Sequence, residues 1–108
     1  MQKYRARKTE IDGITFASAK EGRRYTELKM LERAGEIQDL ALQVKHTLIP
    51  SQRDADGKAV RPVFYVSDFE YTQGGQKVVE DVKGYRTKEY KIKKKLLLYV
   101  EGITIREV

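Results

Sequence analysis

Two adjacent glycines, Gly74 and Gly75, separate two runs of residues, 63–72 and 77–85, that are rich in valine and aromatic side chains. Such a pair is typical of a two-residue β-hairpin turn, since both turn positions need the positive φ that glycine adopts without strain. The turn fixes the register of the two strands, because a slip of one residue would move every side chain to the other face. The chain is therefore predicted to fold around an antiparallel strand pair of known alignment.

This alignment places Asp68 directly opposite Asp81. Opposed residues of an antiparallel pair have Cβ atoms about 4.5–5.5 Å apart, so two carboxylates there repel each other. Since strand side chains alternate, Lys83 shares the face of Asp81. Glu70 shares the face of Asp68, whereas Glu80 points the other way, and we expect both glutamates to have supporting or surface roles. One face of the hairpin thus gathers acidic residues and a lysine.

A divalent cation would relieve the repulsion between the two aspartates. The chain has no cysteine and a single histidine, so any metal must be held by carboxylates. Hard oxygen ligands match Mg²⁺ or Mn²⁺, and a neighbouring lysine can hold a water or a phosphate oxygen, which suits phosphodiester hydrolysis. The residues alone leave open a simpler alternative, in which these are solvated side chains on an exposed hairpin face.

A helix is predicted over residues 18–34, because Ser18 is a good N-cap residue and Glu21 completes a capping box. Glu21 also lies at helical spacing from Tyr25 and Leu28, so its carboxylate falls on the face expected to be buried. Glu21 is therefore either the residue that turns back to the Ser18 amide or a third acid that needs a partner.

The remaining pattern completes a small fold. It predicts a strand over 40–49, a polar loop over 50–61, a second helix over 88–101 and a last strand over 103–108. The buried stripe of the second helix is expected to comprise Ile92, Leu96, Tyr99 and Val100, with lysines opposite. The order helix, strand, strand, strand, helix, strand predicts an α/β fold with a small mixed sheet flanked by helices.

Length and charge narrow the classes of function. The 108 residues suit a single domain, with a basic N-terminal arm at residues 1–8. Lysine and arginine exceed the acids by 22 to 16, and this net charge of +6 favours a polyanionic partner such as nucleic acid. We see no apolar stretch of membrane-spanning length and no phosphate-binding loop, so we expect a cytoplasmic protein without a nucleotide cofactor.

A basic surface is predicted beside the acids. Lysines on the second helix recur at helical spacing, and two arginines follow Glu21, which suits contacts with successive phosphates. The candidate DNA-binding residues are Arg23, Arg24, Lys88, Lys91, Lys94 and Lys95. A solvated helix face is the alternative interpretation of the lysines.

The arrangement of Glu21 on a helix, Asp68 on a strand and Asp81-Val82-Lys83 on the next strand resembles the PD-(D/E)XK nuclease superfamily. The resemblance is greatest to a small phage-encoded family allied to Holliday-junction resolvases, and it spans roughly residues 18–108. Two positions depart from the common pattern: Ser67 replaces a proline, and Asp81 stands where many junction resolvases carry glutamate.

The resemblance implies a restriction-endonuclease-like core and a metal-dependent endodeoxyribonuclease. Asp68, Asp81 and Glu21, with the Val82 carbonyl, would hold Mg²⁺ or Mn²⁺, and Lys83 would position or activate the attacking water. Branched DNA is the implied substrate, in recombination or genome processing, and a homodimer is implied because symmetric junction cleavage needs two active sites. A nicking or restriction-like endonuclease and a non-catalytic basic DNA-binding protein are the alternatives.

Overall fold

The structure is a computed structural model that describes residues 7–108, so most of the expected basic arm (residues 1–8) lies outside the described residues. In chain order the elements are β1 (Thr9–Ile11), β2 (Ile14–Phe16), α1 (Ala19–Arg33), β3 (Gln38–Leu42), β4 (Lys45–Ile49), β5 (Gln52–Arg53), β6 (Ala59–Val60), β7 (Val63–Val66), β8 (Phe69–Gln73), β9 (Gln76–Asp81), α2 (Lys88–Glu101) and β10 (Arg106–Glu107). α1 begins after the predicted N-cap Ser18, and α2 begins at Lys88, as predicted, with Thr87 as its N-cap.

The central sheet has the strand order β10-β9-β8-β3, in which β10 runs parallel to β9 and the other pairs are antiparallel. This mixed sheet with two helices confirms the predicted α/β fold. Gly74 and Gly75 both have positive φ, 58° and 78°, and the hairpin pairs Gln73 with Gln76 and Phe69 with Glu80. The predicted register of the hairpin is therefore confirmed as far as the ladder extends.

The two expected strands 40–49 and 63–72 are each interrupted, which the sequence did not predict. The first breaks after Leu42, where Gln43 has a φ of 51°, and the second breaks at Ser67 and Asp68. The breaks coincide, because the amide of Gln43 donates to the Asp68 carbonyl (3.2 Å) and the amide of Ser67 donates to the Val44 carbonyl (3.0 Å). The long antiparallel pair thus bends as a unit and leaves the central sheet.

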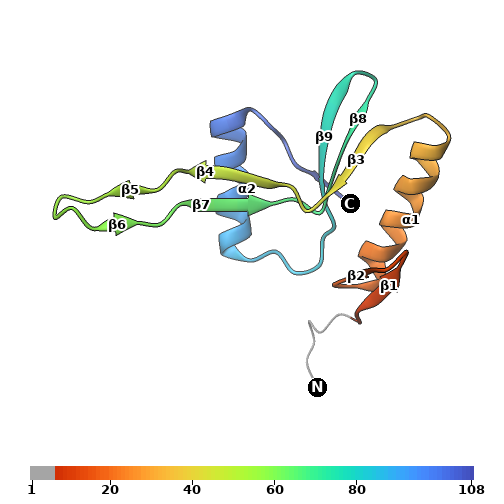
Figure 1. Ribbon diagram of the computed structural model, residues 1–108, viewed down its shortest axis with the longest axis horizontal. Helices are drawn as coiled ribbons and strands as arrows, with labels where there is room; N and C mark the ends of the chain where they lie inside the picture. Colours follow the sequence, from red (N-terminus) through yellow and green to blue (C-terminus); the bar gives the residue numbers. More distant parts are fainter. Residues whose placement is uncertain (1–6) are drawn as a thin grey trace.

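Beyond the bend, β4 pairs with β7, and β5 pairs with β6 within the segment that was expected to be a loop. These strands form a long two-stranded arm that projects away from the central sheet (Figure 1). All residues from 50 to 61 are exposed, so the end of the arm adds nothing to the core.

Two hydrophobic clusters lie on opposite sides of the β8–β9 hairpin, as do α1 and α2 (Figure 1). The first cluster joins α1 and β2 to the side chains of Phe69 and Tyr71. The second joins α2 and the arm to Val79, with Tyr65 and Leu97 at its centre. Alternation along β8 and β9 therefore gives each face of the hairpin its own helix.

The structure buries a different face of α2 from the one that the sequence predicts. Leu97 is fully buried, whereas Ile92 is 59% exposed and Tyr99 is 87% exposed. The helix contacts mainly β4 and β7, so only a narrow line of its surface is covered. The apolar run 96–100 spans most of the helix circumference and therefore cannot define which line that is. Neither helix is long and apolar enough to cross a membrane within the described residues.

Candidate functional site

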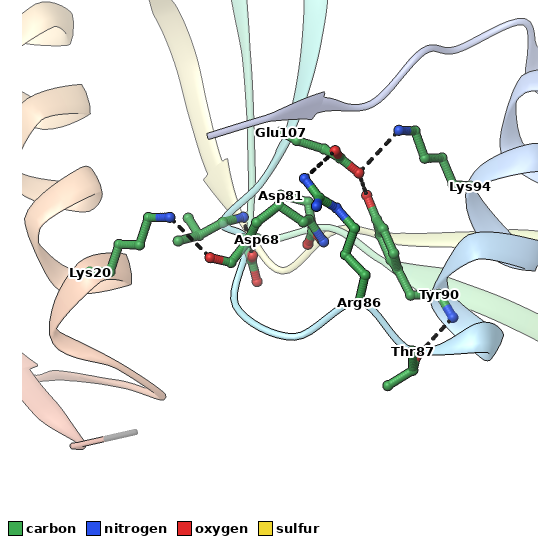
Figure 2. Close-up of polar contacts among 10 residues, drawn as sticks. Lys20, Asp68, Asp81, Arg86, Thr87, Tyr90, Lys94 and Glu107 are labelled. Atoms are coloured by element: carbon green, nitrogen blue, oxygen red, sulfur yellow. Dashed lines mark hydrogen bonds and ion pairs between the residues drawn. The ribbon is translucent and has the colours of Figure 1, made fainter. Parts of the chain in front are cut away.

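The bend in the long strand pair places Asp68 at the end of β9, where Asp81 is the last strand residue. The amide of Asp68 donates to the Glu80 carbonyl (3.2 Å), and the amide of Val82 donates to Oδ2 of Asp68 (2.7 Å). The side chains of Asp68 and Asp81 lie together in this region (Figure 2). The two predicted metal-ligating aspartates are thus adjacent, although Asp68 occupies a bend and not a strand.

The pKa of the Asp68 carboxyl group is raised to about 8, and burial is the largest cause. The hydrogen bond from the Val82 amide acts in the opposite direction, because it favours the ionised form. The neighbouring carboxylates of Asp81 and Glu21 raise the pKa of Asp68 further. Such a rise is expected where acids converge without enough positive charge. A cation at this point would offset the cost of burying the charged carboxylate and would reduce its repulsion by the other acids.

Glu21 is 7% exposed and takes part in the cap of α1, although not through the predicted Ser18 amide. Its amide donates to Oγ of Ser18 (3.1 Å), and its Oε2 accepts from the amide of Ala17 (3.2 Å). The capping box is therefore present in a modified form, with the Ala17 amide in place of the Ser18 amide. Glu21 also lines a pocket of about 320 Å³ together with Asp68 and Gln43. Glu21 and Asp68 therefore line the same pocket.

Lys83 contacts Asp81, as predicted from their shared face. Its Nζ donates to Oδ2 of Asp81 and lies 3.3 Å from the centre of the Tyr90 ring. The hydroxyl of Tyr90 donates in turn to Glu107 (2.7 Å), which also accepts from Arg86 and Lys94 (Figure 2).

The sequence analysis missed three residues around this lysine: Lys20, whose Nζ donates to the Lys83 carbonyl (3.0 Å), Tyr90 and Tyr65. Tyr65 is 4% exposed and lines a second pocket together with Asp81 and Tyr90. No local pattern marks these residues, because each contact joins segments that are distant in the sequence.

The predicted DNA-binding residues differ in how exposed they are and in whether they are already paired with an acid. Lys88, Lys91 and Lys95 are exposed on α2, and Arg23 is exposed beside β1. Lys94 is half-buried and donates to Glu107.

Arg24 is not available to a phosphate, which corrects its predicted role. Its guanidinium makes two hydrogen bonds to the carboxylate of Glu80, at 2.9 and 2.6 Å, and its side chain is 22% exposed. The hydrogen bonds and charge of Glu80 raise the pKa of Arg24 further above its already high value. Arg24 therefore joins α1 to the central sheet.

Glu70 and Glu80 are buried, so the expected surface role for them is wrong. Glu80 points to the α1 side, as its alternation with Asp81 predicts. Glu70 lies on the α2 side, where it binds His46 and the hydroxyl of Ser67. The His46 ring also contacts Glu101 through Nδ1 (3.2 Å). These side chains connect the arm, the sheet and α2.

The donor set suits a hard divalent cation, because Asp68, Asp81 and Glu21 supply carboxylate oxygens. Within residues 7–108, however, no group of three ligating side chains is already gathered around one point. The ammonium group of Lys83 is paired with Asp81. Val82 donates its amide to Asp68, and its carbonyl makes no such contact with that side chain. The acids thus fit such an ion in chemistry, and Lys83 occupies one of the two carboxylate oxygens of Asp81.

Comparison with known protein families identifies one matching family. The family model described as "Protein of unknown function (DUF1064)" matches residues 1–103, which is nearly the whole chain. The chain belongs to the DUF1064 family. No curated protein and no solved structure matches it. All the acids of the site, Lys83 and Tyr65 lie within the part of the chain that the DUF1064 model covers.

Proposed function

We propose that this member of the DUF1064 family is a divalent-metal-dependent endodeoxyribonuclease that acts on branched DNA, of the Holliday-junction resolvase type. The observation that carries the proposal is the position of Asp68, which lies beside Asp81 at the end of β9 and lines a pocket with Glu21. Burial and these two neighbouring acids raise the pKa of Asp68 to about 8. An arrangement that costs stability and serves no packing purpose is typical of a functional site.

Asp68, Asp81 and Glu21, with the Val82 carbonyl, would hold Mg²⁺ or Mn²⁺. The bound cation would supply an activated water and neutralise charge on the cleaved phosphate. Lys83 would then orient the water or a phosphate oxygen from its position over the Tyr90 ring. Lys20, which holds the Lys83 carbonyl, would fix the backbone that follows the acids.

DNA binding is supported by the net charge of +6 and by the exposed lysines Lys88, Lys91 and Lys95 on α2. The contacts would go to phosphates, so binding should depend strongly on salt and weakly on base sequence. We also propose a homodimer in the cytoplasm. The reason for proposing a dimer is that symmetric cleavage of a junction needs two active sites.

The test is cleavage of a labelled four-way junction, a duplex and a single strand of the same sequence, each with Mg²⁺ or with EDTA. We expect Mg²⁺-dependent cutting that is fastest on the junction and absent in Asp81→Asn. Glu36→Gln is the control, because it neutralises an exposed acid that lies outside the acid cluster and outside the predicted DNA-binding residues. Faster duplex cutting would favour a restriction-like endonuclease. Binding without cutting of any substrate, or full activity of Asp81→Asn, would refute the nuclease proposal.

Sedimentation of the purified protein tests the dimer. We expect a mass of twice that of one chain at micromolar concentrations. A monomer mass for the unmodified protein at all concentrations would refute the dimer.

A further inference from the structure

The hydroxyl of Tyr65 is buried and has no hydrogen-bond partner among the residues that the structure describes. The whole residue is 4% exposed, within the cluster that includes Leu97 and Val79. A buried hydroxyl without a partner costs roughly 1–3 kcal/mol. A phenylalanine would fill the same space without this cost, so packing alone does not explain the tyrosine.

The hydroxyl lies close to Asp81 but makes no hydrogen bond of normal geometry to it. Burial is the main cause that raises the pKa of Tyr65. The charge of Asp81 follows, then Tyr90 and Asp68, and a weak hydrogen-bond interaction with Asp81 contributes least. Tyr65, Asp81 and Tyr90 all line one pocket of about 380 Å³ between β7 and the first turn of α2.

Asp81 depends on Lys83 for its neutralisation. It is 9% exposed, and Lys83 Nζ is the partner of its Oδ2. If Lys83 moves toward a phosphate, Asp81 is left as a largely buried carboxylate without a donor. Leaving a buried charge unpaired is costly. In the proposed function Lys83 serves the water or the phosphate, so Asp81 needs another donor whenever Lys83 turns away from it.

We propose that Tyr65 is a positioning residue whose hydroxyl donates to the Asp81 carboxylate when Lys83 leaves it. The Tyr65 hydroxyl thereby gains an acceptor, and the Asp81 carboxylate gains a donor in place of Lys83. Lys83 can remain over the Tyr90 ring, whose face attracts its ammonium group. The hydrogen bond from Tyr65 would hold Asp81 in orientation while the other carboxylate oxygen faces the ion. Second-layer donors of this kind contribute about ten- to hundredfold to metal affinity or activity.

The inference rests on the proposed function for the reason that Lys83 moves, but its first test needs neither metal nor DNA. Tyr65→Phe keeps the ring and removes only the hydroxyl. In the unmodified protein this change should leave the unfolding equilibrium unaltered or make the fold more stable, because the hydroxyl has no partner there. In Lys83→Met, where Tyr65 is the remaining donor to Asp81, the same change should increase the unfolding equilibrium constant about tenfold or more.

Urea unfolding of the four proteins of this cycle, in EDTA, measures the difference. Equal effects of Tyr65→Phe in the two backgrounds would overturn the donor exchange. A non-additive cycle with no nuclease activity would keep the donor exchange and reject only the proposed function.

A second test uses the metal and the substrate. Titration with Mn²⁺ without DNA should show an affinity about ten- to hundredfold lower in Tyr65→Phe. If the protein cuts DNA, kcat should fall in this variant while KM for the junction is unchanged, since Tyr65 does not touch the substrate. Tyr71→Phe is the matched control, because its buried hydroxyl binds Glu80 on the other face. It should lose stability and keep its Mn²⁺ affinity. Unchanged Mn²⁺ affinity and kcat in Tyr65→Phe would contradict the proposal.

Discussion

The ion pair between Arg24 and Glu80 offers a direct test of the correction to the predicted DNA surface. Glu80 is completely buried and accepts three hydrogen bonds, two from Arg24 at 2.9 and 2.6 Å and one from the Tyr71 hydroxyl. In Arg24→Ala the carboxylate keeps only the bond from Tyr71. If Arg24 served the DNA instead, its removal would hardly change the fold.

The magnitude follows from burial. Removing one partner of a buried ion pair costs about 3–5 kcal/mol, because the other charge stays buried and unpaired. The Arg24 side chain is 22% exposed, so water reaches the pair in part and the lower end of this range applies, about 3–4 kcal/mol. Arg23 is exposed on the same helix, so Arg23→Ala should change stability by less than about 0.5 kcal/mol.

Urea unfolding followed by circular dichroism gives both free energies. The midpoint should fall in Arg24→Ala without a change in the slope, which would show that stability and not the unfolded state has changed. The double variant Arg24→Met with Glu80→Leu removes both charges and should be less destabilised than Arg24→Ala alone. If Arg24→Ala lies within about 1 kcal/mol of the unmodified protein, the structural role assigned to Arg24 is wrong.

Three further predictions follow from other contacts. The Tyr90 hydroxyl, with help from Lys94 and Arg86, lowers the pKa of Glu107 from 4.5 to about 2. Stability from Glu107 is therefore complete above its unfolded pKa and is lost as the pH falls toward 2, so Glu107→Gln should flatten the acid dependence of urea unfolding in this range. If the stability of Glu107→Gln falls with pH as steeply as that of the unmodified protein, this role of Glu107 is wrong.

Leu97→Ala should lower the free energy of unfolding by about 2–5 kcal/mol in the same assay, whereas Ile92→Ala should lower it by less than about 0.5 kcal/mol. The reverse order would show that α2 buries the face that the sequence predicts. Finally, Mg²⁺ should raise the thermal unfolding temperature of EDTA-treated protein, and Asp68→Asn should abolish the rise. An equal rise in both proteins would place the ion elsewhere.

Features set by neighbours in the sequence could be predicted. The N-caps Ser18 and Thr87 define the starts of both helices, because each side chain accepts a hydrogen bond from an amide three residues later. Gly74 and Gly75 define the register of the hairpin by their backbone freedom alone. The alternation of Glu80 and Asp81 to opposite faces follows directly from that register.

Features set by distant segments could not be predicted. The buried line on α2 depends on which surface the arm offers, and the helix itself is apolar over most of its circumference near 96–100. The partner of Arg24 is 56 residues away, so a basic residue beside Glu21 has the same local pattern whether it contacts DNA or a buried carboxylate. Charge counts on a helix therefore overestimate the surface that is free for nucleic acid.

Asp68 combines both kinds of information. The hairpin register correctly brings it to Asp81, but a regular strand pair would leave the two acids on an open face where water screens them. The break at Ser67 and Asp68 instead turns the chain, and the carbonyl of Asp68 is held by Gln43 across the bend. The carboxyl group then shares a pocket with Glu21 from α1 and becomes buried enough for its pKa to rise. The local pattern thus identifies the acids, and the bend raises the pKa of Asp68 by burying it beside the other acids.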